Sequence, residues 1–403
     1  MRLITVLGAL AISLFVAEGL LRLAGVSHPI FDQTDPALGN SLIPHAEGWQ
    51  AREGRSFVRI NSHGFRDVER QPAKQPGTLR IAVLGDSFTE ARQVALENTF
   101  CAVLERKLNG NARLPADPVE VLNFGVSGYG TSQQLLALRH RVWQFDPDVV
   151  LLAFYTGNDV SDNSRILKGS STIPYHYYKG GDLLIDHSFA DSDAFQFQSG
   201  HVMGFVRLAL GHSRLLQLLN HIRLVRKLER GEGQNASAFA GPSEPGMRRE
   251  VYVPPATEVW RDAWKVTEGL LATMHDEVSE RGIPFFGVTL SSGIQVHPDP
   301  EDRARFLRDN AVGDLFYPDR RVESLGAREG FPVLTLAPQL QTFAESKGTF
   351  LHGFEPHLGF GQWNESGHEF AGEQIARWLA PQLTASELQV TQEPAGSEIS
   401  SLY

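Results

Sequence analysis

Short apolar runs alternate with segments of helical periodicity along most of the chain after residue 78. The apolar runs are rich in β-branched residues and are typical of buried strands, and they lie at 79–84, 119–122, 148–154, 284–289 and 331–336. Helical patterns lie near 98–108, 131–144, 257–280, 319–329 and 365–379. Strands that alternate with helices indicate a parallel sheet covered on both faces. We therefore predict an α/β domain over 78–382, with three layers and a parallel sheet of about five strands.

Three segments depart from this alternation. Residues 160–255 form an insertion rich in Gly, Tyr and Ser, in which the spacing of leucines predicts one long helix over about 212–230 and the composition predicts a loop over 231–246. Residues 28–77 are turn-rich and precede the domain. Residues 383–403 contain few apolar side chains, which predicts a disordered tail.

The N-terminal 25 residues are strongly apolar. A run from Leu3 to Ala17 follows Arg2, and the apolar stretch reaches about twenty residues if Glu18 and Arg22 extend toward the interface. The residue three before a cut after Ala17 would be Phe15, which is too large for a signal peptidase site. We favour a signal anchor that holds the domain on the extracytoplasmic side, with Arg2 in the cytoplasm. A cleaved signal peptide and a helix packed on the domain are the alternatives.

Composition excludes several classes of partner and cofactor. The 403 residues carry a formal net charge of −10, which argues against nucleic acid. The basic cluster at 223–227 is interpreted as a solvated helix face. The single cysteine, Cys101, allows no intrachain disulfide and no cysteine-rich metal site, and its apolar neighbours indicate a core residue. We predict no cofactor and no metal, because the acidic loop at 297–302 lacks ligand spacing on a fixed element.

A serine follows the first predicted strand directly. Leu84-Gly85-Asp86-Ser87 places a hydroxyl at the end of a buried strand, where parallel α/β sheets carry their chemistry. Ser87 is therefore a nucleophile candidate. Asp86 and Ser87 are also residues that begin helices, so a capping role alone is the alternative.

Two further strand ends carry residues suited to acyl transfer. Gly128 follows the second strand and Asn158 follows the third. Each alone is typical of a turn, but the order Ser, Gly, Asn after successive strands favours a catalytic interpretation. These blocks resemble those of the SGNH (GDSL-type) hydrolases, and the resemblance implies a flavodoxin-like fold. It also implies that Ser87 is the nucleophile and that the amides of Ser87, Gly128 and Asn158 stabilise the oxyanion.

The catalytic base is where the chain departs from this family. The resemblance predicts Asp-x-x-His before the last helix, but the positions are occupied by Gly359 and Gln362. Glutamine accepts no proton from a serine. His357, with Glu355 as a possible orienter, and His368, with Glu365 three residues before it, are the candidate replacements, and His352 is a weaker third. A purely structural role is the favoured interpretation of His368, since it lies in the first turn of the predicted helix beside Trp363.

Two functions follow from these residues. The first is an extracytoplasmic serine esterase or O-acyltransferase that acts on an acylated carbohydrate or a small ester. The second is a non-catalytic protein of the same fold that binds an acylated glycan or a partner, which Gln362 favours. The segment 60–67 resembles one that precedes Gly-Asp-Ser in membrane-anchored relatives, where a lid or a cleft wall is the suggested role.

Overall fold

The computed structural model describes residues 2–51, 53–111, 114, 118–229 and 248–385. Its centre is a five-stranded parallel sheet in the order β11-β10-β7-β5-β6. The strands are β5 (Leu79–Leu84), β6 (Val119–Asn123), β7 (Val149–Tyr155), β10 (Phe285–Leu290) and β11 (Val333–Thr335). In chain order this is 2-1-3-4-5, the flavodoxin-like arrangement. The prediction of a parallel sheet of about five strands is confirmed.

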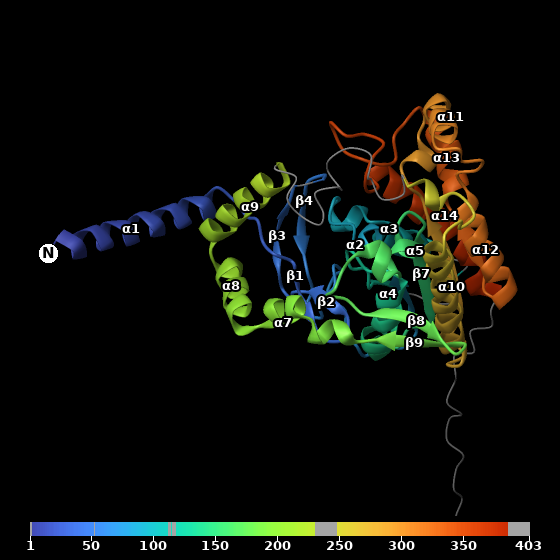
Figure 1. The fold of residues 1–403 in the computed structure, drawn as a ribbon, viewed down its shortest axis with the longest axis horizontal. Helices are drawn as coiled ribbons and strands as arrows, with labels where there is room; N and C mark the ends of the chain where they lie inside the picture. The colour runs from blue at the N-terminus through green and yellow to red at the C-terminus, as the bar shows by residue number, and fades with distance from the viewer. Residues whose placement is uncertain (1, 52, 112–113, 115–117, 230–247, 386–403) are drawn as a thin grey trace, which may run out of the picture.

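Helices cover both faces of this sheet, which gives three layers (Figure 1). One face packs against α4 (Thr131–Ala137), α10 (Glu258–Ser279) and α12 (Tyr317–Glu329). The other packs against α3 (Phe100–Asn109), α13 (Ala337–Lys347) and α14 (Glu365–Ala385). A hydrophobic core lies on each face of the sheet. The side chains of β5 alternate between these two cores, so every residue of this strand is buried.

Outside the insertion, two of the longer helices were not predicted. They are α13 and α11 (Pro300–Asp309), and Phe306 is the one buried apolar residue of α11. Asp299 caps α11 by accepting a hydrogen bond from the backbone N–H of Glu301, so the prediction of a loop through residue 302 was wrong at its end. The predicted helix at 131–144 is α4, continued by a π-helical segment, Leu138–Val142, and a 3-10 segment, Trp143–Phe145.

The segment before the domain forms two hairpins. They are β1 (Asp32–Asp35) with β2 (Gly39–Leu42), and β3 (Glu47–Gln50) with β4 (Ser56–Arg59). Beyond them, the guanidinium of Arg66 is fully buried and donates to the backbone carbonyls of Glu90, Ala91 and Val94. Arg66 of the segment 60–67 therefore holds in place the backbone that follows Ser87.

The first helix, α1 (Arg2–Leu23), extends away from the rest of the chain (Figure 1). Its residues Ile4–Leu23 are long and apolar enough to cross a membrane, and this stretch is not buried against the protein.

The insertion is more structured than its sequence indicated. It contains α5 (Asp159–Asp162), α6 (Arg165–Lys168), a hairpin of β8 (Tyr175–Lys179) and β9 (Asp182–Asp186), α7 (Asp193–Ser199), α8 (His201–His212) and α9 (Arg214–Glu229). The helix predicted over 212–230 is α9, whereas α7 and α8 were not predicted. The loop predicted at 231–246 lies outside the described residues. So does most of the predicted tail, because α14 continues to Ala385 and 386–403 are not described.

Candidate active site

Ser87 is the first residue of α2 (Ser87–Glu90), immediately beyond the buried strand β5. The turn between them is tight, since a Cβ on Gly85 would lie 2.0 Å from Thr89 Oγ1. Asp86 caps α2, because its carboxylate accepts the backbone N–H of Phe88 at 2.9 Å. The capping role therefore belongs to Asp86, and the Ser87 hydroxyl is left for other contacts. The backbone N–H of Ser87 lies in the first turn of a helix, where amides have no helical acceptor.

The side chain that faces Ser87 is Gln362. Its Nε2 lies 3.0 Å from Ser87 Oγ and donates to it, while its Oε1 is buried and makes no hydrogen bond within the described part of the chain. In either orientation of this amide, the group beside the serine is neutral and holds no lone pair that takes up a proton near neutral pH. Gln362 thus occupies the place that the family motif gives to a base, without its chemistry.

The backbone of Gln362 is held from both sides. Its N–H donates to Glu53 Oε1 at 2.5 Å, and its carbonyl accepts the N–H of Gly353 at 2.8 Å. Gly361 has φ of +80°, and a Cβ there would lie 2.1 Å from Glu53 Oε1, so a glycine is needed for the carboxylate to approach. Burial raises the pKa of Glu53, and the hydrogen bond from Gln362 partly opposes this.

Glu53 was missed by the sequence analysis. It lies in the turn between β3 and β4, more than 300 positions before Gln362, and a single acid in a turn carries no pattern. The hairpin therefore brings a carboxylate of the N-terminal segment to the loop that faces the serine.

Gly128 is exposed within the loop after β6, with φ of +83°, and a Cβ at this position would meet open space. Three contacts fix the loop. Glu90 Oε2 accepts the N–H and the hydroxyl of Ser127 at 2.7 and 2.5 Å. Lys168 Nζ donates to the Gly128 carbonyl at 3.3 Å. The peptide around Gly128 is therefore both accessible and held in place, which suits a backbone donor.

Asn158 precedes α5 at the helix-capping position, but its side chain makes no capping hydrogen bond. Its Oδ1 is buried without a hydrogen-bond partner among the described residues. The neighbouring Asn163 accepts the backbone N–H of Ser132 at 2.9 Å, so the start of α4 and the end of α5 are tied together. The loops that carry Gly128 and Asn158 are consequently neighbours.

Topology places all three residues at one edge of the sheet. β5 and β7 are adjacent and parallel, with Leu84 opposite Leu152, and β6 pairs with the other side of β5. Ser87 and Asn158 follow the two strands between which the chain order reverses, and this is where open α/β sheets bind ligands.

Buried acids lie beneath these loops. Burial raises the pKa of Asp86 to about 7, and burial together with the neighbouring Asp86 carboxylate raises that of Asp159 well above its ordinary value. Asp162 pairs with Lys168. Asp159 accepts the N–H of Tyr155 at 2.9 Å, so the group also organises the end of β7. In the described part of the chain, no cluster of His, Cys, Asp or Glu has a geometry that could hold a metal ion.

The three histidines considered as bases lie in different surroundings. His368 is fully buried and its Nδ1 accepts the N–H of Phe100 at 3.3 Å. His352 is also buried, between the carbonyl of Gly361 at 2.7 Å and the hydroxyl of Ser291 at 3.0 Å. Burial lowers the pKa of His368 to about 3 and that of His352 to about 4. The structure brings neither of these two rings into hydrogen-bond contact with Ser87.

His357 is different, because it is exposed on the loop that also carries Gln362. Glu355, its suggested orienter, is exposed too. The other suggested pair, Glu365 and His368, is not formed: Glu365 accepts a hydrogen bond from Asn98 Nδ2 at 3.3 Å. Of the three rings, only that of His357 is open to solvent.

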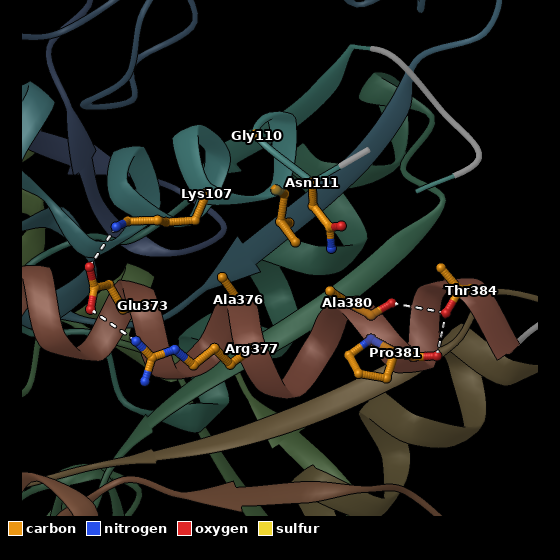
Figure 2. Close-up of a pocket in the computed structure, with 10 residues that line it drawn as sticks. Lys107, Gly110, Asn111, Glu373, Ala376, Arg377, Ala380, Pro381 and Thr384 are labelled. Carbon is orange, nitrogen blue, oxygen red and sulfur yellow. Dashed lines mark hydrogen bonds and ion pairs between the residues drawn. The ribbon is translucent and has the colours of Figure 1, made fainter. Parts of the chain in front are cut away.

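A hollow of about 510 Å³ lies elsewhere, between α3 and α14 (Figure 2). Its wall includes Lys107 and Glu373, which form an ion pair of 2.5 Å. None of its lining residues is Ser87, Gly128, Asn158 or Gln362, so it is separate from the candidate site.

Comparison with known proteins finds one family match and several similar solved structures. Residues 81–184 match the family described as GDSL-like lipase/acylhydrolase. No curated protein matches the chain. Similar solved structures include an acetyl xylan esterase, AlAXEase, at 12% identity, 75% coverage of this chain, 99% of the other and a TM-score of 0.38. A lipase/acylhydrolase from Enterococcus faecalis is 14% identical, and the match covers 75% of this chain and 96% of the other, with a TM-score of 0.37. A two-domain esterase active on acetylated mannans is 11% identical, and the match covers 76% of this chain and 50% of the other, with a TM-score of 0.35.

The matched segment contains Ser87, Gly128 and Asn158 and includes the three adjacent strands β6, β5 and β7. The similarity to the GDSL-like lipase/acylhydrolase family is therefore a match of residues 81–184, which form part of the flavodoxin-like parallel sheet.

Proposed function

We propose that this protein is a membrane-anchored SGNH-type serine esterase or O-acyltransferase that acts outside the cytoplasm on an acylated carbohydrate or a small ester. The observation that carries the proposal is the position of Ser87, whose hydroxyl makes no helix-capping hydrogen bond and which follows a strand at the same edge of the sheet as Gly128 and Asn158. The apolar stretch Ile4–Leu23, with Arg2 before it, supports the anchoring and its direction.

In this reaction Ser87 Oγ attacks the acyl carbonyl and its proton leaves. The carbonyl oxygen becomes an oxyanion, for which the amides of Ser87, Gly128 and Asn158 are the proposed donors. The alcohol then departs with a proton, and an acyl-serine remains. Water completes an ester hydrolysis, whereas a sugar hydroxyl completes a transfer; in both cases the acyl group leaves Ser87 and the hydroxyl is restored.

The proton of Ser87 has no histidine acceptor at position 362. In the wild type, solvent water is the default acceptor of this proton. Because a positioned base contributes roughly 10²–10⁴-fold in rate, we expect slow turnover without one. His357 is the side chain proposed as a replacement base, because it is exposed on the same loop as Gln362. His368 is kept as the second candidate, although its low pKa and its bond from Phe100 oppose the role.

The test uses the purified full-length protein and a small activated acetyl ester. We expect slow hydrolysis that Ser87→Ala abolishes and that Ser346→Ala, at an exposed position of α13, leaves unchanged. Loss of the remaining activity in His357→Ala, but not in His368→Gln, would identify the base. Equal rates for the wild type and Ser87→Ala would refute the esterase proposal.

A specific observation favours one alternative. In the hydrogen bond from Gln362 Nε2 to Ser87 Oγ, the serine oxygen accepts and no base takes up its proton, which suits a pocket that binds an acyl group and does not cleave it. A non-catalytic protein would bind an acetylated oligosaccharide with an affinity that Asn158→Ala weakens, while hydrolysing nothing.

A further inference from the structure

Two helices of the insertion expose an unusual number of apolar side chains. On α8, Val202 and Phe205 are each 72% exposed and Leu208 is 59% exposed. On α9, Leu219 is 55% exposed, and Leu216, Ile222 and Val225 are exposed as well. We call these seven residues the α8–α9 surface. On each helix these residues recur at every third position and so share one helix face, and grouped exposed apolar residues mark a site of contact with a partner or a membrane.

The charge of this region has one sign. Residues 201–226 contain Arg207, Arg214, Arg223 and Arg226 and no Asp or Glu, although the whole chain carries a net charge of −10. Arg223 and Arg226 are exposed beside the apolar residues of α9. Apolar residues flanked by arginine are typical of helices that lie in a bilayer interface, where anionic head groups attract the basic side chains.

The start of helix α9 is joined to α1 by hydrogen bonds. Glu18 of α1 accepts the backbone N–H groups of Arg214 and Leu215 at 2.9 and 3.0 Å, and the hydroxyl of Ser213 at 2.9 Å. These N–H groups begin α9, so a carboxylate of the apolar helix caps a helix of the insertion.

Further contacts fix the same junction. Arg22 donates to the carbonyl of His212 at 2.5 Å, and the rings of His28 and His221 stack with centroids 3.9 Å apart. The backbone N–H of His28 donates to Gln217 Oε1 at 3.0 Å. The start of α9 and the chain leaving α1 are thus one connected unit.

This junction sets the level of α9 along α1. Glu18 lies five residues before the end of α1 at Leu23, which is about 7.5 Å along a helix axis. A helix that starts at this level, beside a spanning helix, starts near the end of the spanning stretch and close to the interfacial layer of a bilayer. Figure 1 shows α8 and α9 beside the inner end of α1, on the side of the domain toward that helix.

We propose that the α8–α9 surface lies on the leaflet from which α1 emerges, so that the lipid bilayer covers its apolar residues. The helix α9, which carries part of this surface, is bound to the apolar helix α1 through Glu18. The arginines beside the surface complement anionic lipid. This contact would hold the domain at a fixed orientation to the membrane. The inference rests on the proposed insertion of α1 but is independent of catalysis at Ser87.

The test uses the full-length chain in vesicles of phosphatidylcholine with phosphatidylglycerol. A polarity-sensitive fluorophore is attached to Phe205→Cys, and to Ser346→Cys as the control on α13. The native Cys101 is buried, and burial raises its pKa, so it reacts slowly with the label. We expect a blue-shifted emission at position 205 that nitroxide-labelled lipids quench, and neither effect at position 346.

Other results distinguish the alternatives. Vesicles that fail to retain the protein after alkaline washing would show that α1 is not inserted, which removes the anchor as well as the surface contact. Retention without lipid quenching at position 205 would overturn the surface contact alone. A blue shift that grows with protein density and resists lipid quenching would assign the surface to a second copy instead. With Val202→Asp and Leu208→Asp added, the quenching at position 205 should be lost while retention persists.

Discussion

Gln362 Nε2 donates to Ser87 Oγ over 3.0 Å, and the same residue is bound through its backbone N–H by Glu53. The serine therefore faces an amide that is fixed by a carboxylate from the N-terminal hairpin. An imidazole at position 362 would meet the serine from a backbone that is already in place.

Gln362→His is expected to raise ester hydrolysis by roughly 10²-fold, the lower end of what a positioned base contributes, because no aspartate stands at Gly359 to orient the ring. The measurement is kcat on a small activated acetyl ester. Gln362→His combined with Ser87→Ala should show no gain, and a gain in that double variant would mean that the new histidine acts without the serine.

Glu53→Ala is expected to destabilise the folded protein by ~1 kcal/mol, because the N–H of Gln362 loses its acceptor. In the Gln362→His background it should also remove most of the gain in kcat, with little change in KM, since the loop that holds the new base would loosen. Glu53→Gln keeps an oxygen acceptor and should rescue both properties. Equal kcat with alanine and glutamine would exclude a positioning role.

Asn158→Ala is expected to lower kcat by roughly 10²–10³-fold without loss of stability, because its side chain makes no capping bond and is proposed as an oxyanion donor. Asn163→Ala is the matched control. Asn163 bonds Ser132 N and Thr267 Oγ1, both at 2.9 Å, so its loss should lower the unfolding midpoint. If Asn158→Ala unfolds as readily as Asn163→Ala, its role is structural.

His368 should make the stability of the protein depend on acid pH. Burial lowers its pKa from 6.5 to about 3, so below pH 6.5 the unfolded chain binds a proton that the folded chain excludes. The free energy of unfolding therefore falls as pH drops from about 6.5 toward 3, by ~2 kcal/mol from this residue at pH 5. Denaturant titrations at pH 7 and pH 5 should show a smaller difference for His368→Gln than for the wild type.

Buried acids act in the opposite direction over the same range. Because the pKa of Asp86 is raised from 3.8 to about 7, this residue contributes to the free energy of unfolding. The contribution is complete below pH 3.8 and is lost as pH rises through about 7. Comparing each variant with the wild type at both pH values cancels this contribution. An unchanged pH difference in His368→Gln would show that His368 is not held neutral by burial.

The sequence by itself determined the α/β core and the chemistry-bearing strand ends. Each central strand is buried on both faces, so its apolar run is continuous and its identity does not depend on distant residues, as in β5 and β7. Ser87 and Asn158 each lie three residues after the end of their strand, so a local pattern located them. The resemblance to the family motif placed Gln362 at the position of the base, and the structure puts this side chain against Ser87.

Only the tertiary structure decided what surrounds these residues. Glu53 reaches Gln362 across more than 300 positions, and Glu18 caps α9 across nearly 200, so neither contact leaves a periodic or spaced signal in the chain. The helix α8 was not predicted, and only the structure shows that its apolar residues Val202, Phe205 and Leu208 face outward. Burial separates the histidines in the same way: residue type alone made His352, His357 and His368 comparable, whereas the fold encloses two of them and exposes one.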